Sequence, residues 1–161
     1  MTADGSIKVR PAEFGDSPAI AAILRQIGWF EHVNEEPPTQ TERRVCENLG
    51  LCNADSSHTV LVVEHEDGAV AGYIAVHWMP NLMAGLDGYV SELFVGSEKG
   101  KGIGTTLLEA IKHEALQRGC KRLMLFNGRS RESYARGFYP KHGWKERQDV
   151  AFFMLYLDEE R

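Results

Sequence analysis

The segment 99–105 carries residue types that can bind a phosphate group. It reads Lys-Gly-Lys-Gly-Ile-Gly-Thr, so three glycines alternate with two lysines and one isoleucine. It follows the β-prone apolar run 93–95 and precedes apolar residues at helical spacing from Ile103 to Ala115. The first N–H groups of a helix lack intrahelical acceptors and carry partial positive charge, and glycine lets an anion approach the backbone. The pattern therefore predicts an anion-binding turn at a helix start, and the alternative is a plain glycine-rich turn.

Two common phosphate motifs do not fit this segment. A P-loop ends in Gly-Lys-Ser/Thr, and the dinucleotide fingerprint needs a glycine where this chain has Leu107. The segment does resemble the pyrophosphate-binding motif of the GNAT superfamily of N-acetyltransferases, Arg/Gln-x-x-Gly-x-Gly/Ala after a Leu-x-Val strand. Lys99 stands where that family usually has Arg or Gln. This departure has little weight, because backbone N–H groups supply most of the contacts in the motif.

Residues 135–144 resemble a second signature of the same superfamily, Ala-x-x-x/Phe-Tyr-x-x-x-Gly-Phe. The resemblance extends from Val9 to about Leu157. It implies an α/β (α+β) GNAT fold with a central mixed, mostly antiparallel sheet of about six to seven strands flanked by about four helices. It also implies a single N-acetyltransferase domain at 7–161, after a short tail at 1–6.

The resemblance implies acetyl-CoA as cosubstrate, with its pyrophosphate on the backbone N–H groups of about 99–104. The superfamily often has Asn seven residues before its conserved Tyr, where this chain has Glu132, so Asn127 is expected to take over part of the pantetheine contact. The implied cofactor-binding residues are Leu93, Phe94, Val95, Lys99, Gly100, Lys101, Gly102, Ile103, Gly104, Thr105, Asn127 and Tyr139.

Tyr139 and Glu92 are the candidate catalytic residues. The resemblance places the Tyr139 hydroxyl near the CoA sulfur, and a tyrosine with a pKa of about 10 is protonated at pH 7, so it can donate to a departing thiolate. The alternative is an amphipathic core tyrosine. An attacking amine must lose a proton, and the Glu92 carboxylate can accept it directly or through water. Alternatively, Glu92 is an exposed strand residue or only contacts a cationic acceptor.

The aromatic and acidic segment 29–36 lies where the superfamily builds its acceptor pocket. Its candidate substrate-binding residues are Trp29, Phe30, Glu31 and Glu35, with Glu36 as a further acidic side chain. Aromatic rings can stack on a cation, and carboxylates attract it. A solvated acidic loop with one packed ring is the alternative.

The resemblance and these residues together predict an acetyl-CoA-dependent N-acetyltransferase, a cytoplasmic acyltransferase that acetylates a primary amine of a small cationic acceptor by direct attack. The alternatives are acetylation of a protein or peptide amine, and a non-catalytic acyl-CoA-binding module of the same fold.

Local patterns predict the elements that position these residues. Asp16 is the expected N-cap of a helix that ends at Gly28. Further helices are expected at 39–51, 103–118 and 133–142, and loops at 29–38 and 79–85. Strands are expected at 7–10, 59–64, 69–77, 89–95, 121–126 and 151–157.

Composition narrows the class of protein. The chain has 161 residues, 43% hydrophobic and 25% charged, and a net charge of −5. These values are ordinary for a globular domain, and the acidic balance argues against a nucleic-acid partner. We expect no signal peptide, no membrane partner and no metal, because apolar runs are short and the six histidines show no paired ligand spacing. A homodimer is compatible with the apolar run 151–157.

Overall fold

The computed structural model describes residues 5–97 and 101–158. Lys99 and Gly100 of the predicted anion-binding turn lie outside these residues. The chain forms two compact units, Met1–Phe126 and Asn127–Arg161, and each is described by itself. The single domain expected at 7–161 stays a prediction.

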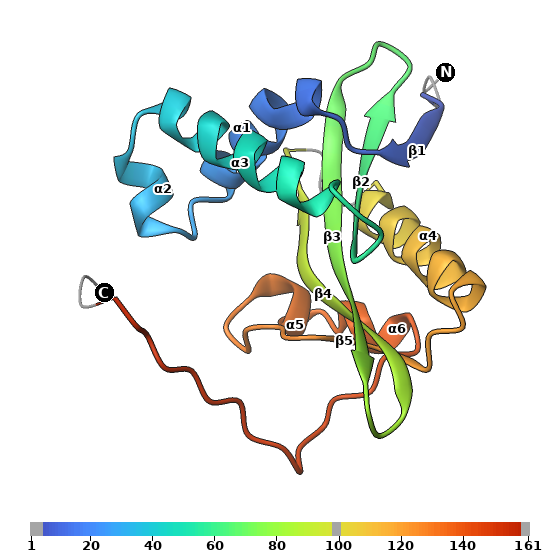
Figure 1. The fold of residues 1–161 in the computed structure, drawn as a ribbon. Coiled ribbons are helices and arrows are strands. Elements are labelled where there is room, and N and C mark those ends of the chain that lie inside the picture. Colours follow the sequence, from blue (N-terminus) through green and yellow to red (C-terminus); the bar gives the residue numbers. More distant parts are fainter. Residues whose placement is uncertain (1–4, 98–100, 159–161) are drawn as a thin grey trace. The chain divides into compact units, whose positions relative to one another are not determined.

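A mixed sheet forms the centre of the first unit (Figure 1). Adjacent strands are antiparallel except β4 and β5, which are parallel, so the predicted mostly antiparallel sheet is confirmed. In the described part of the chain it has five strands, fewer than the six to seven expected. In spatial order they are β1 (Ile7–Pro11), β2 (His58–His65), β3 (Val70–Asn81), β4 (Gly85–Val95) and β5 (Arg122–Leu125).

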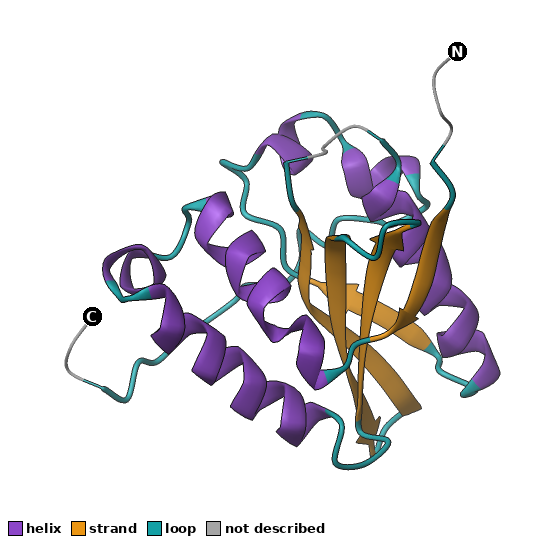
Figure 2. Ribbon diagram, turned by 90° about the horizontal axis from the view of Figure 1, so that it is seen from above, coloured by secondary structure: helices purple, strands orange, loops and turns teal. Residues whose placement is uncertain are grey.

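Helices pack on both faces of the sheet (Figure 2). On one face, Ile20, Ile23 and Leu49 join buried side chains of β2 and β3 in one apolar cluster. On α4, Leu107 and Ile111 are fully buried. Each such side chain contributes about 1.5–3 kcal/mol when it leaves water. The helical elements of the first unit are η1 (Phe14–Asp16), α1 (Ser17–Ile27), α2 (Glu31–Glu35), α3 (Pro38–Cys52) and α4 (Ile103–Gln117).

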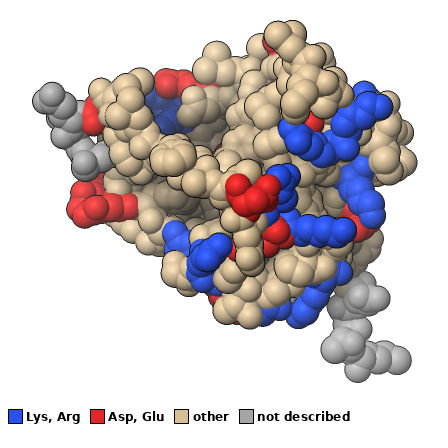
Figure 3. All heavy atoms as spheres, turned by 90° about the horizontal axis from the view of Figure 1, so that it is seen from below, with Lys and Arg blue, Asp and Glu red and all other residues tan. Residues whose placement is uncertain are grey.

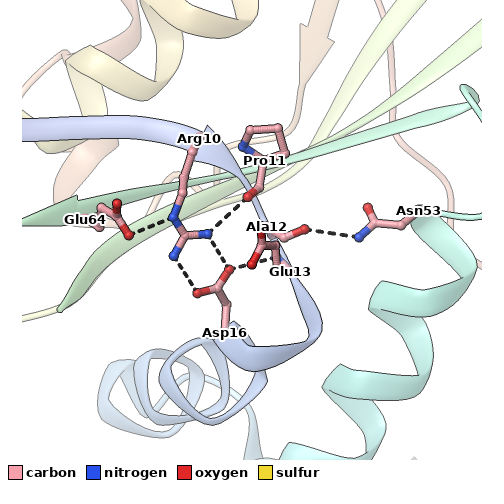
Figure 4. Close-up of polar contacts among 7 residues, drawn as sticks. All are labelled: Arg10, Pro11, Ala12, Glu13, Asp16, Asn53 and Glu64. Atoms are coloured by element: carbon pink, nitrogen blue, oxygen red, sulfur yellow. Dashed lines mark hydrogen bonds and ion pairs between the residues drawn. The ribbon is translucent and has the colours of Figure 1, made fainter. Parts of the chain in front are cut away.

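An ion-paired network holds the start of α1 (Figure 4). Arg10 of β1 donates to both carboxylate oxygens of Asp16 at 2.8 Å, and its Nε donates to Glu64 of β2 at 2.7 Å. Asp16 was expected to cap α1, but its side chain makes no capping bond there and instead accepts the N–H of Glu13 at 2.7 Å. The Arg10 guanidinium lowers the pKa of Asp16. The network therefore joins β1, β2 and η1, the short helix directly before α1.

Both predicted loops contain regular structure. The segment 29–38 includes α2, a helix too short for an apolar periodicity to indicate it. β3 runs to Asn81 and β4 begins at Gly85, so the predicted loop 79–85 is mostly strand. The Asn81 side chain accepts the N–H of Ala84 at 2.6 Å, which closes a tight turn.

The second unit departs further from the sequence-based expectations. The helix expected at 133–142 is two short helices, α5 (Glu132–Ala135) and α6 (Phe138–Lys141). Gly137 lies between them with φ of 65°, and this left-handed conformation ends a helical path. The strand expected at 151–157 is wrong, since the described residues there form no strand and Phe153 is 88% exposed. β-prone residues form a strand only where a neighbouring strand pairs with them.

Charges of both signs share the surface. On the face in Figure 3, Lys and Arg side chains occur together with Asp and Glu side chains. Within 5–97 and 101–158, none of the helices has the length and apolar character needed to cross a bilayer.

Candidate active site

Glu92 lies on β4 next to a β-bulge. The register with β3 shifts between Val90 and Glu92, so Ser91 is the extra residue. One inserted residue changes which side chains point to each face of a sheet. Ser91 Oγ lies 2.8 Å from Nε2 of His77 on β3, so a side-chain contact spans the bulge.

The bulge directs Glu92 to the sheet face covered by α1 and α3. Glu92 pairs with Ala75, and the next pair toward the end of β4 is Phe94 with Tyr73. Directly paired residues of antiparallel strands share a face. Ala75 and Tyr73 belong to the apolar cluster that includes Ile23 of α1, and Phe94 packs against it. Glu92 is therefore a carboxylate at the border of an apolar core.

Tyr73 supplies the hydrogen bond that the structure gives to Glu92. Its hydroxyl donates to Glu92 Oε1 at 3.1 Å. Burial raises the pKa of Glu92 and the Tyr73 hydrogen bond opposes that rise. Burial and the Glu92 charge raise the pKa of Tyr73 well above its usual value, and burial followed by the Glu92 charge raises the pKa of the Cys52 thiol on α3. The Glu92 carboxyl is thus adjusted toward proton exchange nearer to neutral pH.

Aromatic rings surround Phe94 beside this carboxylate. The Phe94 ring makes edge-to-face contacts with Trp29, Phe30 and Tyr73, with centroid distances of 5.7, 5.9 and 5.9 Å. Trp29 is 41% exposed, so the group reaches solvent. The fold therefore brings the predicted acceptor residues Trp29 and Phe30 to the strand that carries Glu92.

The acidic side chains near these rings have different partners. Glu31 and Glu35 lie exposed at the two ends of α2. Glu36 accepts hydrogen bonds from Arg44 and Thr41, chiefly Arg44, and they lower its pKa to about 2. Glu36 therefore holds α3 against the segment before it, and only Glu31 and Glu35 remain as candidate contacts for a cationic acceptor.

The start of α4 is positioned against the end of β4. Gly102 precedes the helix with φ of 77°, and its carbonyl accepts the N–H of Thr106 at 2.9 Å. A side chain at Gly72 would lie 3.0 Å from both the Ile103 side chain and the Phe94 carbonyl, so glycine there permits the close approach. The remaining predicted cofactor residues of this unit are Leu93 and Val95 on β4, Lys101 before α4, and Gly104 and Thr105 in its first turn.

Tyr139 and Asn127 belong to the second unit. Tyr139 lies in α6 and packs edge-to-face on Phe138 and Trp144, with centroid distances of 5.0 and 6.0 Å. Burial raises the pKa of Tyr139 to about 12, so its hydroxyl is protonated at any physiological pH. The Asn127 side-chain carbonyl accepts the Ser133 hydroxyl at 3.0 Å. The Tyr139 hydroxyl is thus available as a hydrogen-bond donor.

Two features of the site were not predicted from the sequence. The bulge has a signal, since apolar Val90 and Leu93 are three residues apart where a regular strand would repeat every two. The contact between Tyr73 and Glu92 has no sequence signal, because it depends on the β3–β4 register.

Known proteins resemble this chain in sequence and in fold. The model of the acetyltransferase (GNAT) family matches residues 22–144. Thialysine N-epsilon-acetyltransferase of Bos taurus is 22% identical over 153 residues, which cover 86% of this chain and 89% of that protein. A transcriptional regulator structure from Bacillus halodurans superposes with a TM-score of 0.81 at 20% identity, covering 94% of this chain and 100% of that one. Glucosamine-6-phosphate N-acetyltransferase from Arabidopsis thaliana gives 0.72 at 22% identity, covering 95% and 99%.

Proposed function

The chain belongs to the GNAT family of acetyltransferases, and on that premise we propose that it acetylates a primary amine of a small cationic molecule. The observation that carries this proposal is the position of Glu92, a half-buried carboxylate beside four aromatic rings at the border of the apolar core. Such a group can attract an ammonium ion and then accept its proton.

The donor is acetyl-CoA, the cosubstrate of the family, which supplies an activated acetyl group as a thioester. The fit rests on the start of α4, where Gly102 adopts a left-handed conformation and Gly72 lets the helix approach β4. Backbone N–H groups at a helix start favour a pyrophosphate, and Lys101 adds charge. We assign Leu93, Phe94 and Val95 to the binding of the acetyl-pantetheine arm, with Asn127 as a further contact.

Proton transfer is the part of the reaction assigned to side chains. Glu92 accepts a proton from the acceptor amine, directly or through water, and the neutral amine attacks the thioester without a covalent enzyme intermediate. Tyr139 donates a hydrogen bond to the departing thiolate, which then takes its proton from solvent. A tyrosine pKa of about 12, above the value of about 8.5 for a free thiol, keeps the hydroxyl protonated so that it can stabilise the negative sulfur.

Charge and the relatives support the proposed acceptor class. Trp29 and Phe30 are aromatic rings near Glu92 that can bind a cation, and Glu31 and Glu35 add negative charge on α2. The name of the Bos taurus relative assigns it an ε-nitrogen of thialysine. We infer an acceptor of similar kind, an alkylamine with a free cationic end.

The experiment that tests this function is a thiol-release assay with acetyl-CoA and a panel of amines. The panel contains thialysine, lysine, a polyamine, an aminoglycoside, glucosamine 6-phosphate and a peptide with a free N-terminus. We expect the highest kcat/KM with a small cationic alkylamine and a low value with the phosphorylated amine. Preference for the peptide would overturn the acceptor class. Tight CoA binding without turnover of any amine would support a non-catalytic acyl-CoA-binding module instead.

The Tyr139→Phe variant tests the assigned hydrogen-bond donor in the same assay. We expect kcat to fall about tenfold or more with little change in KM for acetyl-CoA, because the lost hydroxyl acts late in the reaction. The matched control is Tyr134→Phe, a tyrosine of the same unit whose hydroxyl donates to Glu146 at 2.9 Å. Equal kcat in wild type and Tyr139→Phe would remove this assignment.

Metal ions have no part in the proposal. In the ranges 5–97 and 101–158, no three His, Cys, Asp or Glu side chains are grouped as metal ligands. We expect EDTA to leave the rate of thiol release unchanged.

A further inference from the structure

We propose that Tyr73 is a positioning residue that holds the Glu92 carboxylate in place and keeps it ionised for catalysis. The inference rests on the proposed function, because it assigns a task to Glu92 in that reaction. Tyr73 itself touches no reacting atom. It acts through a single hydrogen bond between two neighbouring strands, 3.1 Å from the Tyr73 hydroxyl to Glu92 Oε1.

The strand register makes this contact rigid. Tyr73 pairs with Phe94, and Glu92 pairs with Ala75, so donor and acceptor lie diagonally across β3 and β4 on one face. Diagonal neighbours on one face are within reach of long side chains. Tyr73 is 2% exposed and belongs to the apolar cluster under α1 and α3, so its ring cannot turn away. The phenol therefore offers its proton from a fixed position.

The bulge is the reason that the two side chains meet. With Ser91 as an extra residue, Glu92 points to the same face as Tyr73. The contact between Ser91 Oγ and His77 Nε2, at 2.8 Å, fixes that bulge from β3. Glu92 is thus held on two sides, by the backbone shift that precedes it and by the phenol beside it.

The Tyr73 hydrogen bond has a large effect on the protonation of Glu92, because the titratable groups near Glu92 are neutral. The Glu92 charge raises the pKa of Tyr73 on β3 and of Cys52 on α3, so both are neutral at pH 7. Burial lowers the pKa of His77, which contacts the neighbouring Ser91. A carboxylate beside an apolar core favours its protonated form unless a donor compensates. A protonated Glu92 could not accept a proton from an amine, so the phenol keeps the base usable near neutral pH.

The Tyr73→Phe variant removes the donor and keeps the ring. A hydrogen bond to a charged group stabilises that charge, so its loss should raise the pKa of Glu92 by about one unit. The acid limb of the kcat/KM profile should move to higher pH by the same amount. Activity should then fall about tenfold on that limb and recover at alkaline pH. The matched control is Tyr89→Phe, which removes a hydroxyl from the same sheet face and should leave the limb in place.

A direct titration separates this inference from the proposed function. In protein labelled with carbon-13 at glutamate carboxyls, the Glu92 resonance, assigned with Glu92→Gln, should titrate at higher pH in Tyr73→Phe than in wild type. An identical titration in both proteins would overturn the role of Tyr73, even if the enzyme is active. A shifted titration in a protein that acetylates no amine would keep the contact and reject the function.

A second measurement tests the contact between Tyr73 and Glu92 if the Tyr73→Phe variant does not fold. In the wild-type protein, the Tyr73 hydroxyl proton should exchange slowly with water, and its proton resonance should move as Glu92 titrates. A resonance that is lost to fast exchange, or that does not follow the Glu92 titration, would overturn the contact.

Discussion

Asp16 and Glu92 are both carboxylates with limited access to water, but the fold gives them different hydrogen-bond donors. Asp16 accepts two hydrogen bonds from the Arg10 guanidinium and one from a backbone N–H. Glu92 accepts its hydrogen bond from the Tyr73 phenol, a neutral group. The pKa of Asp16 is lowered, chiefly by Arg10, whereas the pKa of Glu92 is raised by burial.

This difference separates a carboxylate with a structural role, Asp16, from one that can act as a general base, Glu92. A carboxylate paired with arginine stays ionised at low pH and rarely releases or accepts a proton in a reaction. A neutral donor stabilises the ionised carboxylate less than arginine does, so the pKa of that carboxyl lies closer to neutral pH, as a general base requires. The comparison predicts opposite consequences when each side chain is changed to its amide.

The Glu92→Gln variant should show the largest effect, a loss of activity without a loss of stability. We expect kcat/KM to fall about a hundredfold or more, because the amide cannot accept a proton. The free energy of unfolding should not fall, since Gln still accepts the Tyr73 hydrogen bond without a buried charge. The measurements are thiol release and urea denaturation at pH 8. Unchanged kcat/KM from pH 6 to pH 9 would contradict the role of Glu92 as base.

The Asp16→Asn variant should show the reverse pattern, with a loss of stability. The free energy of unfolding should fall by about 1.5 kcal/mol, because the partly exposed Arg10 guanidinium loses one of its two counter-charges and keeps Glu64. The kcat/KM of the folded enzyme should stay near the wild-type value. Glu35→Gln, on an exposed position of α2, is the control and should change stability by less than about 0.5 kcal/mol. A stable Asp16→Asn protein with reduced activity would invalidate the comparison.

Much of the first unit could be predicted from the sequence because its signals are local. Apolar spacing predicted α1, α3 and α4, and Gly28 and Gly119 end α1 and α4 with φ of 72° and 70°. β-branched runs predicted β1 and β2 for the same reason. The family resemblance also identified Glu92 as a candidate from its place before Val95.

The features that adjust Glu92 could not be predicted, since they depend on the register of two strands. A single residue at Ser91 decides which face Glu92 occupies and whether Tyr73 can reach it. The secondary structure of the second unit was harder to predict for another reason. Its helices are too short for periodicity, and the apolar residues at 151–157 indicate β propensity without indicating a pairing strand.

The Trp29→Leu variant tests whether the rings near Glu92 recognise a cation. Leucine keeps the position apolar but removes a ring that contacts Phe94 and that the proposed function assigns to the acceptor. We expect KM for a cationic amine to rise up to about tenfold, since a cation–π contact contributes about 0.5–2 kcal/mol. The acid limb of the pH profile should not move. Phe126→Leu, at an exposed residue directly after β5, is the control, and an equal rise in KM for both variants would exclude a specific role for the ring.

The smallest expected effect is on the pH dependence of the free energy of unfolding. The contributions of Asp16 and Glu92 to this dependence should have opposite signs. The folded-state pKa of Asp16 lies below its ordinary value of 3.8, so its contribution is complete above that pH and is lost as pH falls through the folded pKa. The folded-state pKa of Glu92 lies above its ordinary value of 4.5, so wild type should gain stability as pH falls through the folded pKa toward 4.5.

Urea denaturation of wild type and both amide variants from pH 8 to pH 3 measures this difference at constant ionic strength. The deficit of Asp16→Asn should shrink below about pH 4, because protonated Asp16 no longer pairs with Arg10. The advantage of Glu92→Gln over wild type should be present at pH 8 and absent by about pH 4.5. Parallel curves for all three proteins would mean that neither carboxyl differs in pKa between the folded and unfolded chain.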